Sequence, residues 1–344
     1  MADDSARAWK AWVQMLLLAT FLTVHFGDWR QSWHGTSGLT HVGESAFDEV
    51  RWENQGILAA VDPNTGEWLW NVVLDTPAGF ALGSDQIYIN SMYGNRISVL
   101  SPNLELVDVL ARWFMNDLHS LVLTERGLLL TSSGVDGVVE VNSSGDELWA
   151  WFATECAYPF DHSGTRRKIS RRNDYRQNAI STRQQTTHCN SAVCHQGNGM
   201  DHMLVTLFHQ GELVAVDRLT GKFSVILTGM NRPHSIGKTE AGWIVCDSRS
   251  NGVVSLDENF WITSVVTGGF DWVQDAILCD GRLLVADANH SRLVWWDVGK
   301  DKQVGEIEYS DQWKIYQIEA VEGVWENRLR GLTPSSYSGD ATLS

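Results

Sequence analysis

The sequence repeats one local pattern six times, and this repetition constrains the fold more than any other feature. Each copy is a short apolar strand, a polar turn and a second apolar strand, and successive copies are spaced by roughly 40 residues. Clear copies occupy residues 129–141, 204–217, 244–257 and 284–297. A strand pair this short cannot bury both of its faces alone, so each repeat must stack on its neighbours.

A period of this size, with about four short strands in each unit, is typical of a β-propeller, whose blades surround a central axis. We predict an all-β propeller over residues 33–325, with six blades as the main interpretation and seven as the alternative. The segment Tyr316–Val321 has the pattern of one more innermost strand. If it completes a blade begun by the N-terminal residues, the ring closes and no sheet edge is exposed.

Three segments depart from the repeat. Residues 157–186 form an insertion between the third and fourth copies, and it is basic in a strongly acidic chain. Residues 1–32 contain an apolar run at 12–26, which is shorter than the roughly 20 residues of a membrane-spanning helix. We expect this run to pack on or precede the propeller, with an export signal or membrane anchor as the alternative. The tail at 326–344 is rich in Ser, Gly and Thr, which favours partial disorder.

The charge and the cysteines exclude some functions. The net charge of −16 argues against nucleic-acid binding, because that affinity depends on neutralising phosphates. The five cysteines are odd in number and have no CxxC spacing, so they indicate neither a disulfide framework nor a thiolate zinc site. Free thiols suit a reducing compartment, and we expect a cytoplasmic protein that does not enter a membrane. The oligomeric state is left open.

Three histidines fall at the start of innermost strands, where side chains face the axis of a propeller. They are His119, His188 and His234, and His41 is a fourth candidate if the first repeat has a shorter turn. Neutral imidazoles that converge on one axis are suitable ligands for a divalent transition metal, and Fe, Cu, Ni and Zn all fit. The alternative is that each histidine separately fills the axial channel and bonds to water or backbone.

Other polar residues are expected on the same face of the propeller. Gln274, Asp275 and Gln317 occupy the matching step of other repeats and are candidate catalytic or metal-supporting groups, and Arg249 is a candidate catalytic charge. A mobile flap formed by the insertion would hold a small anionic substrate through paired hydrogen bonds from arginine. The candidate substrate-binding residues are Arg166, Arg167, Arg171, Arg172, Asn190, His209 and His290. The alternative for the insertion is a solvated loop or an arm that docks a partner.

Two segments resemble the arylsulfotransferase propellers. His188–Val193 is similar to the His-x-Asn-Ser-Val strand of that family, and Gly137–Trp151 is similar to its strand-turn-strand that ends in tryptophan. The resemblance implies that His188 or His119 accepts a sulfuryl group from an aryl sulfate, with Arg249 or the insertion arginines stabilising the charge. Six-bladed lyases, lactonases and carotenoid oxygenases resemble the chain in histidine placement only.

These observations leave three functions open. The first is a metal-dependent enzyme that performs an oxidation or a lyase step on a small anion. The second is a metal-free transferase of sulfuryl or related groups with a histidine nucleophile. The third is a non-catalytic scaffold that binds other proteins through the faces of the propeller.

Overall fold

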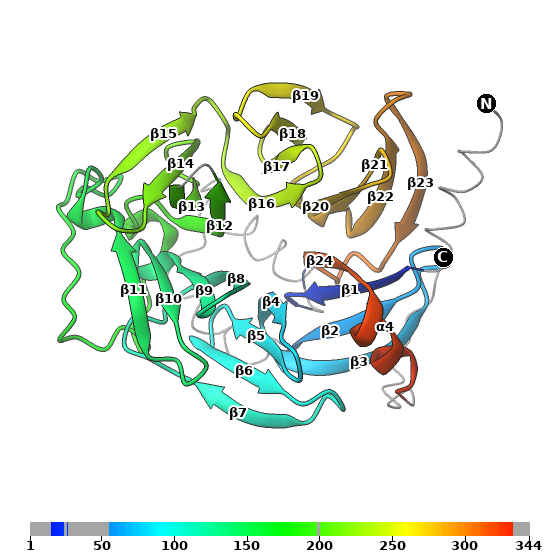
Figure 1. The fold of residues 1–344 in the computed structure, drawn as a ribbon, viewed down its shortest axis with the longest axis horizontal. Coiled ribbons are helices and arrows are strands. Elements are labelled where there is room, and N and C mark those ends of the chain that lie inside the picture. The colour runs from blue at the N-terminus through cyan, green and yellow to red at the C-terminus, as the bar shows by residue number, and fades with distance from the viewer. Residues whose placement is uncertain (1–14, 24–25, 27–54, 198–199, 333–344) are drawn as a thin grey trace, which may run out of the picture.

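Six four-stranded antiparallel sheets surround a common axis (Figure 1). The structure is a computed structural model that describes residues 15–23, 26, 55–197 and 200–332. Each sheet is one blade of a β-propeller, with one strand at the axis and one at the rim. The predicted all-β fold with six blades is confirmed, and the insertion lies between blades three and four as predicted.

The strands of a blade follow one another from the axis to the rim. Blade one contains β24 (Ile315–Val321), β1 (Leu16–Phe21), β2 (Gln55–Val61) and β3 (Trp68–Asp75). Blade two contains β4 (Pro77–Leu82), β5 (Ile87–Ser91), β6 (Arg96–Leu100) and β7 (Leu106–Leu110). Blade three contains β8 (Leu118–Thr124), β9 (Gly127–Ser132), β10 (Gly137–Val141) and β11 (Glu147–Phe152).

The other three blades repeat this order. Blade four contains β12 (Cys189–Gly197), β13 (Met200–Leu207), β14 (Glu212–Asp217) and β15 (Phe223–Leu227). Blade five contains β16 (Pro233–Thr239), β17 (Gly242–Asp247), β18 (Gly252–Asp257) and β19 (Ile262–Val266). Blade six contains β20 (Val273–Cys279), β21 (Arg282–Asp287), β22 (Arg292–Asp297) and β23 (Lys302–Glu308). The described helices are η1 (Ser133–Val135), η2 (Ala153–Glu155), η3 (Thr182–Gln184), η4 (Ala288–His290) and α4 (Gly323–Arg330).

Blade one closes the ring with strands from the two ends of the described chain. β1 pairs with β24 on one side, where Leu18 faces Glu319, and with β2 on the other, where Leu18 faces Ala60. The prediction that Tyr316–Val321 completes a blade begun by N-terminal residues is confirmed. The structure also places Leu16–Phe21 inside the propeller, so the domain begins at or before residue 16 and not at residue 33.

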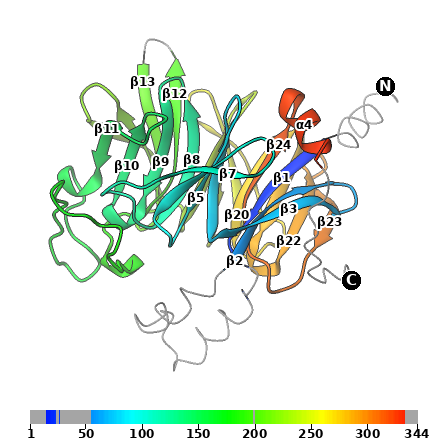
Figure 2. The ribbon, with the colours of Figure 1, turned by 90° about the horizontal axis from the view of Figure 1, so that it is seen from below.

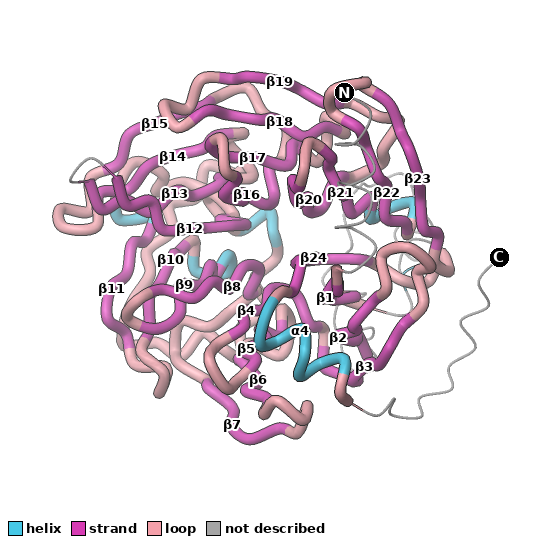
Figure 3. The backbone as a smooth tube through the Cα atoms, turned by 45° about the vertical axis from the view of Figure 1, so that its right-hand side comes forward, coloured by secondary structure: helices cyan, strands magenta, loops and turns pink. Residues whose placement is uncertain are grey.

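The apolar run and the C-terminal tail both contribute ordered elements. The described part of the run contains the buried strand β1. None of the helices in the described residues is long and apolar enough to cross a membrane. Part of the tail predicted to be disordered belongs to α4, which lies across blades one and two (Figure 3). Its Leu329 carbonyl accepts a hydrogen bond from Trp70, and Trp325 donates to the Gly83 carbonyl.

The hydrophobic core is divided among the contacts between neighbouring blades. Leu129 and Val138 of blade three pack against Met203 and Val205 of blade four, for example, and similar clusters join the other five pairs of neighbours. Burying one such side chain contributes about 1.5 to 3 kcal/mol. Each blade thus buries apolar side chains of the next, which places the six innermost strands around one axis.

Polar side chains also join the innermost strands to one another. The third residue of an innermost strand accepts a hydrogen bond from a backbone N–H of the next innermost strand. Four such bonds are Ala192 to Ser120 (3.2 Å), Ile236 to Ser191 (3.4 Å), Ile318 to Asp275 (2.9 Å) and Phe80 to Gln317 (2.9 Å). This repeated bond fixes the relative height of the strands, so residues at equal steps lie at equal depth along the axis.

Candidate metal site at the axial mouth

The second residue of each innermost strand lies near the axis at the face where the strand begins. These residues are Tyr316, Ala78, His119, Asn190, His234 and Gln274 in blades one to six. The sequence interpretation placed His188 at this step together with His119 and His234. In the structure Asn190 holds the position in blade four, and His188 lies two residues earlier, before β12 begins. The predicted alignment of three histidines at one step is therefore wrong in blade four.

His188 belongs to a set of residues, one near the start of the innermost strand in each of five blades, that have a positive φ angle. Thr76, Asp117, His188, Arg232 and Trp272 have φ values of 41°, 54°, 50°, 60° and 68°. None of them is glycine, so each left-handed conformation costs of the order of 1–2 kcal/mol. Strain that recurs at one step must be maintained by the surrounding structure, and it is common where side chains are positioned for function. These residues surround what we call the axial mouth.

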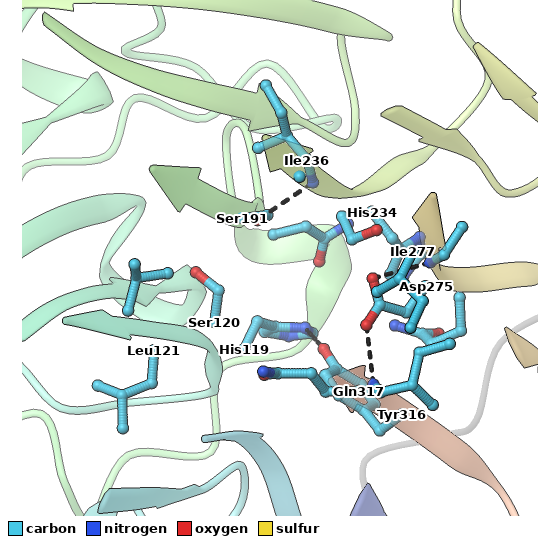
Figure 4. A pocket seen from close by; sticks show the side chains of 17 residues that line it. His119, Ser120, Leu121, Ser191, His234, Ile236, Asp275, Ile277, Tyr316 and Gln317 are labelled. Atoms are coloured by element: carbon cyan, nitrogen blue, oxygen red, sulfur yellow. Dashed lines mark hydrogen bonds between the residues drawn. The ribbon is translucent and has the colours of Figure 1, made fainter. Parts of the chain in front are cut away.

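His119 is buried and has different partners on its two ring nitrogens. Nδ1 forms a short hydrogen bond of 2.5 Å with the hydroxyl of Tyr316 (Figure 4). Nε2 lies 3.3 Å from Oδ1 of Asp117 but forms no hydrogen bond with the described residues. Burial and the charge of Asp117 hold the pKa of Tyr316 well above its usual range, so its hydroxyl keeps its proton. A hydroxyl can donate or accept, which leaves Nε2 of His119 free to carry a lone pair.

His188 is also buried, and its pKa is well below the ordinary value of a histidine. Burial is the main cause, and the neighbouring imidazoles of His119, His209 and His234 add to it. The imidazole is therefore neutral. Nδ1 donates to the side-chain oxygen of Gln185, whose amide in turn donates to Oδ2 of Asp117 at 2.8 Å. In this tautomer the lone pair is on Nε2.

The buried carboxylate of Asp136 holds the segment that carries His188. Its Oδ1 accepts the backbone N–H groups of Thr186, Thr187 and His188 at 2.8, 2.8 and 3.1 Å. Its Oδ2 pairs with Arg167 of the insertion. Three backbone bonds to one carboxylate explain how a histidine is kept in a left-handed conformation at the axial mouth.

Asp117, His119 and His188 form a cluster whose ligand atoms lie within 4.8 Å of one another. The rings of the two histidines meet edge to face with centroids 4.6 Å apart. Protein ligands about 2.1 Å from a common ion lie about 3 to 4 Å apart, so an ion requires a contraction of roughly 1 Å. One carboxylate and two imidazoles are donors that suit a divalent transition metal. Nδ1 of His119 is bonded to Tyr316, and Nδ1 of His188, which is bonded to Gln185, lies 3.8 Å from Oδ2 of Asp117.

His234 lies at the axis but outside this cluster. Its Nδ1 pairs with the Ser248 hydroxyl at 2.7 Å, and its ring packs against Phe208 and Trp272. Burial, followed by the charges of His119 and Lys314, holds its pKa well below the usual range. Of the four predicted ligands, the structure thus brings His119 and His188 together, joins them with Asp117 in place of His234, and leaves His41 outside the described residues.

Positive side chains stand at the same mouth. Arg232 lies over the Phe208 ring at 5.4 Å, and partial burial together with the charge of Arg249 lowers its pKa. Neither arginine forms an ion pair with any residue that the structure describes. Arg249 was predicted from the sequence, whereas Arg232 was not. Two neighbouring guanidinium groups without an acid favour an anion.

Three predicted catalytic residues have structural partners. Asp275 and Gln317 form two of the bonds between innermost strands, and burial raises the pKa of Asp275 to about 6. Gln274 contacts the hydroxyl of Tyr316 and accepts the indole N–H of Trp272 at 3.1 Å. Gln274 thus supports His119 through Tyr316, while Asp275 and Gln317 stabilise the ring.

The insertion packs onto blades two to four and is not a free flap. Figure 2 shows it on the face opposite the β12–β13 tip. Asn116 donates to the carbonyls of Tyr175 and Asn178 at 2.7 and 2.8 Å, Asn95 donates to that of Arg176 at 2.8 Å, and Tyr175 is buried. The predicted mobile flap is therefore corrected to an anchored cover whose last residues include Gln185.

The arginines of this segment divide into two groups. Arg167 is paired with Asp136 and Arg171 with Glu147, so both hold the insertion in place. Arg166 and Arg172 are exposed, and neither forms an ion pair within the described residues. A substrate role remains a prediction for all four, and the partners of Arg167 and Arg171 oppose it.

The last three predicted substrate-binding residues lie in different places. His209 bonds to Nε2 of His162 and to the Thr182 carbonyl, both at 2.8 Å, and lies 5.9 Å from the ring of His188. Asn190 lines the axis and donates to the Pro233 carbonyl. His290 pairs with Asp287 in a turn of blade six and is half exposed.

No protein-family model and no curated protein matches this chain. A solved structure of a protein of unknown function from Bacteroides caccae is similar, with 14% identity, a TM-score of 0.58, and coverage of 90% of this chain and 100% of that one. The nidogen/laminin complex has 11% identity, a TM-score of 0.55 and coverage of 88% and 97%. The WD40 propeller domain of Doa1 has 11% identity, a TM-score of 0.50 and coverage of 74% and 76%. These likenesses show the propeller fold alone, and no family model supports the resemblance to arylsulfotransferases.

The sequence interpretation missed Asp117, Gln185 and Tyr316. Asp117 had a usable signal, because it precedes His119 by two residues just as Arg232 precedes His234. Tyr316 also had one, as the second residue of the closing strand. Gln185 had none, since its role depends on how the insertion returns to the axis.

Proposed function

We propose that the protein is an enzyme whose divalent metal is held by Asp117, His119 and His188 at the axial mouth. The observation that carries the proposal is the convergence of one carboxylate and two imidazoles, including a buried Nε2 of His119 without a hydrogen bond among the described residues. Two histidines and one carboxylate leave coordination positions open for water or substrate, as in non-haem iron(II) and zinc enzymes.

The metal would supply Lewis acidity or oxygen activation, which suits an oxidation or a lyase step. The protein residues have separate tasks. Tyr316 and Gln185 orient the two imidazoles through Nδ1, and Asp136 positions His188 through its backbone. His234 would offer a neutral imidazole to the substrate, because burial holds its pKa well below the usual range. Its Nδ1 is bonded to Ser248, so Nε2 would face the substrate.

The substrate in this proposal is a small anion. Arg232 and Arg249 are close enough for the charge of one to lower the pKa of the other, and no described carboxylate pairs with them. A substrate carboxylate between them would form charge-assisted hydrogen bonds and would reduce this repulsion. The reacting end of the substrate would then reach the metal.

A metal-free transferase with a histidine nucleophile is the second candidate. The neutral imidazole of His188 favours it, because an imidazole must be unprotonated to attack. Transfer of a sulfuryl group from an aryl sulfate would place the S–O bond electrons on the phenolate and leave a sulfohistidine. Full activity in chelator, with a trapped sulfohistidine, would favour this candidate over the metal enzyme.

Metal analysis is the direct test. The purified protein is equilibrated separately with Fe(II), Cu(II), Ni(II) and Zn(II), desalted and measured by elemental analysis. We expect one ion per chain in the wild type, none in the His119→Ala and His188→Ala double variant, and one in the His234→Ala control. Equal metal in wild type and double variant, or none in the wild type with any of the four ions, would overturn the proposal.

A further inference from the structure

A cavity of about 180 Å³ lies on the propeller axis and includes His119 and His234 in its wall (Figure 4). Its lining comes from five innermost strands: β8, β12, β16, β20 and β24. An engineered cavity of about 150 Å³ in another protein is large enough for benzene, so this one has room for about six carbon atoms. The cavity thus begins at a proposed metal ligand and extends into the ring.

The lining changes from polar to apolar along the axis. The second and third residues of the strands contribute polar groups, among them His119, Asn190, His234, Gln274, Asp275 and Tyr316. The fourth and fifth contribute Leu121, Val122, Ile236, Ile277 and Ile318. Leu121, Ile236 and Ile318 are almost fully buried in the clusters between blades, so the apolar surface open to the cavity comes mainly from Val122 and Ile277. Because a strand rises about 3.3 Å per residue, the apolar level lies roughly 7 to 10 Å deeper than His119. A molecule that fills the cavity therefore needs an apolar end.

The charges set the orientation of such a molecule. Arg232 and Arg249 stand at the mouth, where Asp117 is the one acidic group of the proposed metal site, and the acids Asp275 and Glu319 lie further along the axis, at the third and fifth residues of their strands. An anionic group is attracted at the mouth and repelled in the cavity. Burying CH₂ groups against the lower level is favourable.

We infer that the substrate of the enzyme proposed above is amphipathic: an anionic head group stays at the mouth between Arg232 and Arg249, and an apolar chain or ring of about six carbon atoms enters the axial cavity. Calling this molecule a substrate rests on the proposed function. The binding geometry itself does not require the metal.

Straight-chain carboxylates from butanoate to decanoate test the inference by isothermal titration calorimetry. Each CH₂ that enters an apolar site strengthens binding about fourfold. We expect this gain up to about six carbons beyond the head group and a plateau thereafter. Arg232→Ala should weaken all members of the series by a similar factor, because it removes a contact to the common head group. Equal affinity along the series in the wild-type protein would overturn the inference.

Val122 provides a matched pair of variants. It lines the cavity, is half buried and belongs to none of the hydrophobic clusters between blades, so its side chain can change without altering those contacts. Val122→Phe should bring the plateau to shorter chains, and Val122→Ala should move it to longer ones. Circular dichroism confirms that both variants fold. An unchanged plateau in two folded variants would also overturn the inference.

The same series separates this inference from the proposed metal. It is measured on chelator-treated protein and on the Asp117→Asn variant, which keeps the cavity but lacks one proposed ligand. Chain-length dependence that persists there while the wild type binds no metal would defeat the proposed function and support the cavity as a ligand site. Stoichiometric metal binding without chain-length dependence would support the metal site and overturn the amphipathic substrate.

Discussion

Two halves of the axial ring place polar residues at different steps of the innermost strands, and the two sets serve different purposes. In blades three and four, Asp117, His119 and His188 point their ligand atoms toward one another. In blades six and one, side-chain oxygens of Asp275 and Gln317 accept hydrogen bonds from the backbone of the next innermost strand. The step along the strand therefore decides the role: residues before the strand and at its second position surround the mouth, whereas third residues, including Ser120 and Ser191 of blades three and four, join the blades.

Replacing the proposed metal ligand Asp117 should have the largest effect on the difference between the two halves. In Asp117→Asn the negative charge is lost while the left-handed backbone is preserved, because asparagine tolerates that conformation. We expect loss of stoichiometric metal, which exceeds the roughly 100-fold weakening that follows removal of an outer partner. Arg232→Asn, a change at the equivalent step of blade five, should keep the metal. Elemental analysis of both variants decides the point, and equal metal in the two would contradict it.

Asp136 is expected to matter for stability because it serves several buried groups at once. Asp136→Ala leaves three backbone N–H groups and Arg167 without their acceptor. Loss of one partner of a buried ion pair lowers the free energy of unfolding by about 3 to 5 kcal/mol. Asp174→Ala in the same insertion removes only an exposed pair with Arg176 and should cost at most about 0.5 kcal/mol. Urea unfolding measures both, and similar midpoints would refute the role of Asp136.

Asp275, which joins blade six to blade one, should make the stability of the protein depend on pH. Burial raises the pKa of Asp275 from 3.8 to about 6, so the folded protein binds the proton more tightly than the unfolded chain. The stabilisation from this proton is complete below pH 3.8 and is lost as the pH rises through 6, a change of about 3 kcal/mol. An asparagine has a single side-chain oxygen, so Asp275→Asn can keep the bond from Ile318 but gives up the one from Ala276, and its stability should not fall between pH 4.5 and 7.5 as that of the wild type does. If the free energies of unfolding of the wild type and of Asp275→Asn changed in parallel between pH 4.5 and 7.5, the prediction would be contradicted.

The smallest effect is expected at Tyr316, which links the two halves. Tyr316→Phe removes the partner of Nδ1 of His119 but no proposed ligand. Metal affinity should fall by about tenfold, the lower end of the range for such outer partners. A competition titration with a chromophoric chelator measures it, and Tyr88→Phe, which loses only a contact to Gln86, is the control. Unchanged affinity would show that His119 does not need its tyrosine.

Several elements of the site could be predicted from the sequence because they follow from the repeat. The start of β8 and the start of β16 fall at matching steps, which located His119 and His234 near the axis. His188 was misplaced by two residues because a long insertion precedes β12, and repeat spacing cannot be counted across it. Asp117 was visible beside His119, but whether its carboxylate faces a neighbour or solvent depends on a backbone angle that the sequence pattern does not report.

The sequence by itself determined the propeller fold and indicated the strand that closes the ring, since alternating apolar strands must be buried by neighbours of the same kind. The structure decided between six blades and seven. The tertiary structure alone decided which polar residues meet. Asp117 and His188 are separated by the whole of blade three and the insertion, and they approach because Asp136 and Gln185 hold the returning chain at the axis. The local sequence predicts that a strand forms, whereas the contact between two distant side chains depends on the path of the whole chain between them.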